Sequence, residues 1–169
     1  MNISLLPILE CSLELRAWGL SDAQWIGYVR VNGLTAVNYT RYVYPTNAEV
    51  RGINTVLLKP TDCSTFGNQR FDTSGDLNAS VQLVSWINSL SSGTVVLGVS
   101  CYEARMMLTS DAISALSTIG VKLSGLVTYG KFAFVAVIGS PQSTVYRVAD
   151  AGGDNLVVKA VVVDQYIVG

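Results

Sequence analysis

The sequence predicts a single α+β domain in which strands outnumber helices. A chain of 169 residues has the size of one domain. Hydrophobic residues make up 50% of the chain and charged residues only 14%, which suits a sheet that is covered on both faces. The hydrophobic period changes from two residues to nearly four and back again, so the expected order is strands, helix, strand, helix, strands. This order favours an α+β layered domain over a doubly wound one.

The first third of the chain is expected to form strands. Residues 12–18 and 25–31 alternate polar and apolar side chains, a pattern typical of half-buried strands. Asn32-Gly33 lies between apolar runs, and because both residues tolerate a positive φ, the pair is a strong hairpin signal. Residues 35–44 complete the expected hairpin.

A central strand and the first helix are expected next. Residues 52–58 are almost continuously apolar, which is typical of a strand buried on both faces, and residues 69–72 are its expected partner. Residues 76–90 carry apolar side chains at helical spacing and predict an amphipathic helix with Ser74 or Asp76 as its cap. The expected apolar stripe consists of Leu77, Val81, Val84, Trp86 and Ile87.

The remainder of the chain adds one strand, a second helix and three more strands. Residues 94–99 form the expected strand, and residues 110–119 form the helix, with Gly120 in the position after its C-terminus. Strand-like runs follow at residues 131–138, 144–148 and 156–163. Because no repeat or linker interrupts this order, residues 1–169 are expected to form one domain.

The composition argues against catalysis, metals, nucleic acid and membrane insertion. The chain has no histidine, which excludes Ser–His and Cys–His nucleophiles and removes a common zinc ligand. No phosphate-binding glycine loop or calcium loop appears, and no spacing singles out a pair of carboxylates. The net charge is −1 without a basic run, and no apolar run reaches the roughly 18 residues of a membrane-spanning helix. We therefore expect a protein that is not an enzyme and has no cofactor or metal.

Cysteines and glycosylation motifs leave their own alternatives open. The cysteines are Cys11, Cys63 and Cys101. This odd number permits one disulfide with a free thiol, an intermolecular bond, or three buried thiols. Three N-x-S/T motifs begin at Asn2, Asn38 and Asn78 and favour the secretory route, whereas the sequence leaves open whether these asparagines carry sugars.

Aromatic residues gather around the expected first hairpin. An aromatic ring beside polar groups can stack on the face of a sugar. Trp18 and Tyr28 fall in alternating strands and are expected in the core. Tyr42 and Tyr44 lie at a strand end and are candidates for contact with a ligand.

Three stretches of the chain carry a family resemblance. They are RGINTVLL at 51–58 with FDT at 71–73; SGTVVLGV at 92–99; and residues 115–120 with KFAFV at 131–135 and Gly139. In this order and spacing they resemble the interleukin-like EMT inducer (ILEI) domain, also called the pancreatic-derived factor (PANDER) domain. The resemblance covers roughly residues 12–140.

The resemblance implies a fold and a class of function. It implies two packed, mainly antiparallel β-sheets flanked by two or three short helices. Similar domains occur in secreted cytokine-like proteins, in extracellular modules of hyaluronan-degrading proteins, and in the lumenal stem of the O-mannose N-acetylglucosaminyltransferase, which recognises sugar. None of these domains is itself catalytic, which agrees with the lack of catalytic motifs.

The resemblance also implies a carbohydrate site. Arg51 matches an arginine of the sugar-binding stem domain, whereas Tyr102 stands where that domain has an acid and Tyr129 where it has a second arginine. Glu103, next to Tyr102, and Lys131 can supply hydrogen bonds, so all five residues are predicted ligand-binding residues. Alternatively, Arg51 is a surface cation, Glu103 interacts with a helix dipole, and the two tyrosines pack together.

The resulting expectation is a secreted, non-catalytic, lectin-like module that binds a glycan or glycoprotein. One alternative is a cytokine-like or adhesion protein that binds a protein receptor. Another is a structural subunit of an extracellular assembly, in which case the chain forms a homo-oligomer. No nucleic acid partner and no membrane insertion are expected.

Overall fold

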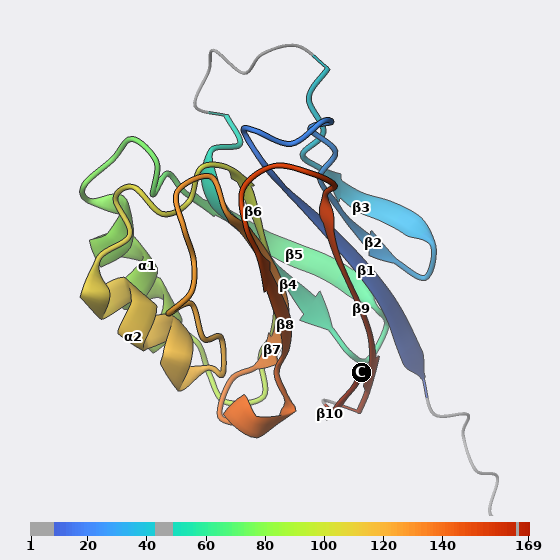
Figure 1. The fold of residues 1–169 in the computed structure, drawn as a ribbon. Helices are drawn as coiled ribbons and strands as arrows, with labels where there is room; N and C mark the ends of the chain where they lie inside the picture. Colours follow the sequence, from blue (N-terminus) through green and yellow to red (C-terminus); the bar gives the residue numbers. More distant parts are fainter. Residues whose placement is uncertain (1–8, 43–48, 165) are drawn as a thin grey trace, which may run out of the picture.

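The computed structural model describes residues 9–42, 49–164 and 166–169, and Figure 1 shows the fold. The strands are β1 (Glu10–Gly19), β2 (Tyr28–Val31), β3 (Leu34–Asn38), β4 (Gly52–Lys59), β5 (Ser64–Phe71), β6 (Val95–Tyr102), β7 (Lys131–Val137), β8 (Val145–Ala149), β9 (Leu156–Val163) and β10 (Tyr166–Val168). The helices are α1 (Ala79–Ser89), α2 (Ser110–Thr118) and the 3-10 turn η1 (Pro141–Ser143). The α+β class, dominated by strands and with two short α-helices in the described residues, is therefore confirmed.

All described strands belong to one open sheet. Its main order is β10-β9-β1-β6-β4-β5, while β2 and β3 extend from β1, and β7 and β8 extend from β6. The pairings are antiparallel except where Trp18 and Gly19 of β1 pair in parallel with Cys101 and Tyr102 of β6. This short parallel ladder links all the strands, so the expected division into two packed sheets is not confirmed.

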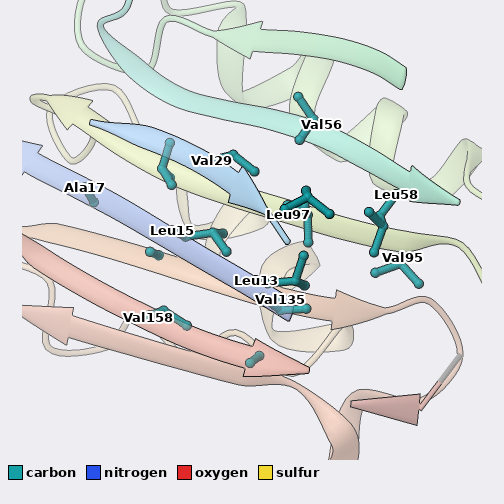
Figure 2. Packing of buried hydrophobic residues seen from close by; sticks show 14 of the residues in the cluster. Leu13, Leu15, Ala17, Val29, Val56, Leu58, Val95, Leu97, Val135 and Val158 are labelled. Carbon is teal, nitrogen blue, oxygen red and sulfur yellow. The ribbon is translucent and has the colours of Figure 1, made fainter. Parts of the chain in front are cut away.

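The strands on both sides of this link contribute to one hydrophobic cluster. On β1 the alternation turns Leu13, Leu15 and Ala17 into the cluster, where each is at most 2% exposed. Side chains of β2, β9, β4, β6 and β7 complete it, and Figure 2 shows Leu97 and Val135 beside the β1 residues. Each fully buried Leu or Val side chain contributes about 1.5–3 kcal/mol, so this cluster is a main source of stability.

Both α-helices cover the other face of β4, β6 and β7, and they lie on the same side of the sheet in Figure 1. A second cluster forms there, in which the rings of Phe132 and Phe134 stack with centroids 6.3 Å apart. Gly98 of β6 makes room for this packing, because a Cβ at that position would lie 2.2 Å from the Phe134 ring.

Several sequence predictions are confirmed. Asn32 and Gly33 form the hairpin turn with φ values of 50° and 79°. β4 lies between β6 and β5, as expected for a central strand. Trp18 and Tyr28 are buried, at 0% and 7% exposure. The end of the predicted 35–44 strand, including Tyr44, and the motif at Asn2 lie outside the described residues.

The predicted cap of the first helix is wrong, and so are two residues of its predicted stripe, whereas Ile87 is buried and Val84 and Trp86 pack against the second cluster as expected. The N-cap of α1 is Asn78, because the Asp76 carboxylate instead accepts a hydrogen bond from the Asn78 backbone N–H (2.8 Å) and forms a turn before the helix. Leu77 and Val81 are 73% and 64% exposed, since contacts with the sheet and α2 bury a different face of the helix. The buried residues of α1 are Ala79, Ser80, Leu83 and Ile87.

One disulfide bond closes the edge of the main cluster. Cys11 at the start of β1 bonds to Cys63 in the turn between β4 and β5, 52 positions later in the sequence, with a Cα separation of 5.5 Å. Cys101 is a free thiol, and its complete burial raises its pKa far above the usual range. The structure thus selects one disulfide and one buried thiol from the open alternatives.

Reduction of this disulfide is expected to destabilise the protein. A closed loop of 52 residues removes enough unfolded-state entropy to contribute about 4 kcal/mol. A reductant should therefore lower the thermal midpoint, measured by circular dichroism, by roughly 10 °C. The Cys11→Ala/Cys63→Ala double variant should melt at the lower temperature with or without reductant. An unchanged wild-type midpoint in reductant would contradict this assignment.

Candidate functional site

The predicted site residues lie at one end of the sheet. Arg51 directly precedes β4, Tyr102 ends β6, and Lys131 begins β7. Because β6 pairs antiparallel with both β4 and β7, the start of β4 and the start of β7 flank the end of β6. The loops that follow β5 and β6 meet at the same end, at the upper left of Figure 1.

Arg51 is held beside the loop that follows β5. Its Nη2 donates to Asp72 Oδ2 at 2.7 Å, and this hydrogen bond raises the pKa of Arg51. Gly75 makes the approach possible, since a Cβ there would lie 2.4 Å from Nη2. The Arg51 side chain is 28% exposed, and its buried Nε atom has no hydrogen-bond partner. Arg51 is therefore a cation that Asp72 holds in place, and its Nε–H group is a donor without an acceptor.

Glu103 is a structural clamp between two loops. Only 1% of the residue is exposed, and its carboxylate accepts hydrogen bonds from the backbone N–H of Arg105 and, at 2.5 Å, of Tyr129. The acidic residue in the first turn of α2, where a carboxylate would interact with the helix dipole, is Asp111 rather than Glu103. The Glu103 carboxylate therefore joins the loop after β6 to the loop before β7.

Lys131 is buried in an ion pair. Its Nζ donates to Asp22 Oδ1 at 2.5 Å and to the carbonyl oxygen of Gly152 at 2.8 Å, and its side chain is 2% exposed. The other Asp22 oxygen accepts hydrogen bonds from the Gly19 backbone N–H and from Asn155 Nδ2. The pair therefore ties β7 to the turn after β1 and to the loop before β9.

The two tyrosines lie where chain segments cross. Tyr102 and Tyr129 both have a positive φ, at 68° and 58°, and both are half-buried. The Tyr102 carbonyl accepts from the Leu20 backbone N–H at 2.8 Å, and the ring meets Trp18 edge-on with centroids 6.5 Å apart. Left-handed backbone at a non-glycine residue costs of the order of 1 kcal/mol and is typical of positions fixed by their surroundings.

Three of the five predicted residues are partly exposed, namely Arg51, Tyr102 and Tyr129. Glu103 and Lys131 lie beneath them with their charges bound inside the protein. None of the five lines any of four hollows, of about 270–380 Å³, on the described part of the chain. These hollows lie elsewhere on the fold, away from the predicted site residues.

Sequence reasoning missed the neighbours of these residues. Asp22 and Asp72 had no distinguishing signal, because their partners lie 109 and 21 positions away in the sequence. Leu77 and Val81 were assigned to the core by their helical spacing, yet they are exposed beside the loop that contains Asp72.

In the described ranges, no group of three or more acidic, cysteine or histidine side chains is arranged to hold a metal ion. No helix in the described part of the chain has the length and hydropathy needed to cross a membrane.

Comparison with known proteins identifies the family. The model of the interleukin-like EMT inducer family matches residues 51–140. The matched stretch begins at Arg51, directly before β4, and ends shortly after β7. The chain belongs to the interleukin-like EMT inducer family. A comparison with curated proteins found no match. The matched ILEI region contains β4 to β7 and both α-helices, whereas the expected kinship with the glycosyltransferase stem domain is not confirmed.

Loss of the buried cation should destabilise this ILEI domain more than loss of an exposed one. Lys131→Met leaves the Asp22 carboxylate buried without its ion-pair partner, which costs about 3–5 kcal/mol. Lys159→Met removes a lysine whose side chain is 74% exposed and should cost less than about 1 kcal/mol. Urea unfolding measures both free energies.

The double variant Asp22→Asn/Lys131→Met provides the internal control. It removes both charges but keeps an acceptor for the Gly19 N–H, so it should be more stable than Lys131→Met alone. Equal unfolding midpoints for Lys131→Met and Lys159→Met would show that the pair has no structural role.

Proposed function

We propose that this chain is a secreted, non-catalytic, cytokine-like domain that binds a protein receptor through its sheet-end surface. This surface consists of Arg51, Leu77, Val81, Tyr102 and Met106. The observation that supports the proposal is the exposure of three apolar side chains there: Leu77 at 73%, Val81 at 64% and Met106 at 55%. Its position within the region matched by the ILEI family adds support.

Hydrogen bonds bring the two segments of this surface together. The Met107 backbone N–H donates to the Thr73 carbonyl oxygen at 2.7 Å, and Ser80 Oγ donates to the Met107 carbonyl oxygen at 2.7 Å. The loop that carries Met106 is therefore fastened to the start of α1, where Leu77 and Val81 project. The Arg51–Asp72 ion pair borders the same loop.

The chemistry of this surface fits a protein partner. Helix α1 carries no acidic residue in its first turn and no basic residue in its last turn, and its sequence, ASVQLVSWINS, has no charge at all. Protein interfaces combine an uncharged centre with methionine, tyrosine and arginine at or near the energetic hot spots. An open apolar surface with Arg51 at its border matches this pattern better than it matches a sugar cleft.

A glycan bound at Arg51, Tyr102 and Tyr129 is the second candidate function. It is favoured by the buried Arg51 Nε, which has no hydrogen-bond partner, and by the half-buried state of both tyrosines. Glu103 and Lys131 would then support the site from below rather than contact the sugar. A structural role through homo-oligomers is a further possibility, since Tyr166 and Val168 of the edge strand β10 are 72% and 61% exposed.

The receptor proposal predicts a localised loss of binding. Fluorescently labelled protein should bind to animal cells that carry the receptor, and Leu77→Asp/Val81→Asp should weaken binding at least tenfold, because two charges would be buried in the interface. Leu34→Asp is the matched control, since Leu34 is 76% exposed in the β2–β3 hairpin.

Treatment of the cells separates the two candidates. Protease treatment should abolish binding and glycosidase treatment should leave it unchanged if the partner is a protein. Binding that depends on Arg51 and glycosidase-sensitive sugars, but not on Leu77 and Val81, would replace the receptor proposal with the glycan one.

A further inference from the structure

A second surface of the fold has the properties of an anion site. It lies on the outer face of β1, β2 and β3, where the strand register forms two cross-strand rows. In one row Arg16 pairs with Tyr28, and Tyr28 pairs with Asn38. In the next row Glu14 pairs with Arg30, and Arg30 pairs with Thr35. Side chains in such rows lie within contact distance of one another.

These two rows border a hollow of about 340 Å³. Its lining residues are Arg16, Ile26, Tyr28, Arg30, Thr35, Asn38, Thr40 and Tyr42. Two of them are arginines and none is a carboxylate, although the whole chain has a net charge of −1. The hollow is therefore locally positive on a protein that is close to neutral, which favours an anionic occupant.

Arg16 lines the hollow with a guanidinium donor that has no acceptor. It forms no ion pair with any acidic side chain in the described ranges, and its buried Nε atom has no hydrogen-bond partner. Its guanidinium carbon lies 5.9 Å from the centroid of the Tyr28 ring, which keeps the side chain against β2. An unpaired buried donor on a cation is costly, and an oxyanion that accepts from it would remove that cost.

Arg30 supplies the second cation. Its guanidinium stacks over Tyr28 with 4.0 Å between its carbon and the ring centroid, and its Nε donates to Thr35 Oγ1 at 3.3 Å. The only carboxylate that contacts it in the described residues, Glu14, is 3.4 Å from Nη1. Glu14 is also bound by the Tyr28 hydroxyl at 2.5 Å and by Lys159 at 3.6 Å, so it does not neutralise Arg30 alone.

The rim of the hollow offers groups that suit a sugar. The Asn38 side-chain oxygen accepts from the Thr40 backbone N–H at 2.9 Å, and among the described residues the amide nitrogen of Asn38 keeps its capacity to donate. The Tyr42 side chain is 91% exposed and presents an aromatic face at the edge. Hydroxyl, amide and aromatic groups around two arginines are the combination that binds a saccharide carrying an acidic group.

From this arrangement we propose that the outer face of β1, β2 and β3 binds an acidic saccharide, whose carboxylate or sulfate group lies between Arg16 and Arg30. The hollow on the other side of Arg16, of about 270 Å³, contains Asp154 and would repel the anion. The site is separate from the sheet-end surface and does not depend on the receptor proposal.

The test is calorimetric titration of the full chain, prepared without N-glycosylation because Asn38 begins a glycosylation motif. The probes are a sulfated heparin-derived hexasaccharide, its desulfated but carboxylated counterpart, neutral maltohexaose, and a sulfotyrosine peptide. At least one acidic saccharide should bind, and the comparison of the first two assigns the anion as sulfate or carboxylate. Maltohexaose should not bind.

Matched variants locate the site. Arg16→Gln and Arg30→Gln should each weaken binding at least tenfold. Arg147→Gln and Arg51→Gln should change it less than twofold, since Arg147 is exposed on β8 and Arg51 belongs to the sheet-end surface. Loss with Arg51→Gln but not with Arg16→Gln would place any sugar at the sheet end and overturn this proposal. Equal losses with all four arginine variants would reveal unspecific charge attraction and would also overturn it.

A measurement on the wild-type protein removes any dependence on variant folding. The Nε–Hε resonance of Arg16 should shift in the NMR spectrum as the acidic hexasaccharide is added, because that buried donor gains an acceptor. No shift at saturation, or binding of the sulfotyrosine peptide with no binding of either acidic saccharide, would refute the site as described.

Discussion

The pairing of β1 with β6 is the constraint on which the rest of the structure depends. β1 is bordered by β9 and β2 along most of its length, and only Trp18 and Gly19 reach β6. This contact requires glycine at position 19, because a Cβ there would lie 2.2 Å from the carbonyl oxygen of Tyr129. The Gly19 N–H donates to Asp22, so the same turn that ends β1 also places the partner of Lys131. One close approach of backbones therefore positions a sheet junction and a buried ion pair together.

The buried charges at the sheet end explain why function is expected on outer surfaces. Glu103 and Lys131 were attractive ligand residues in the sequence, but their atoms hold four connecting segments in place through hydrogen bonds inside the protein. A buried carboxylate or ammonium group must be paired to be tolerated, and a group used for this purpose has little capacity left for a ligand. What remains available is the open surface around Arg51 and Tyr102, and the hollow beside Arg16.

These two surfaces differ in the chemistry that they offer. The sheet-end surface is apolar and uncharged at its centre, which suits a shape-complementary protein partner. The outer face of β1, β2 and β3 has two arginines and an aromatic rim, which suits a soluble acidic ligand. Because they lie on different elements, a receptor and an acidic saccharide would not compete for the same side chains. Binding to both would raise the local concentration of the domain at a cell surface that carries acidic glycans.

The sequence by itself determined the local elements, because these depend on short-range patterns. The turn at Asn32-Gly33, the central strand at 52–58 and the helix at 110–119 follow from backbone freedom and hydrophobic period, and each is present. The family resemblance in the sequence also pointed to the ends of neighbouring strands, and the starts of β4 and β7 do flank the end of β6. Only the tertiary structure decided that Cys11 bonds to Cys63, that Leu77 and Val81 face outward, and that Lys131 is paired with Asp22. These outcomes depend on contacts between segments distant in the chain, and for such contacts the sequence contains no local signal.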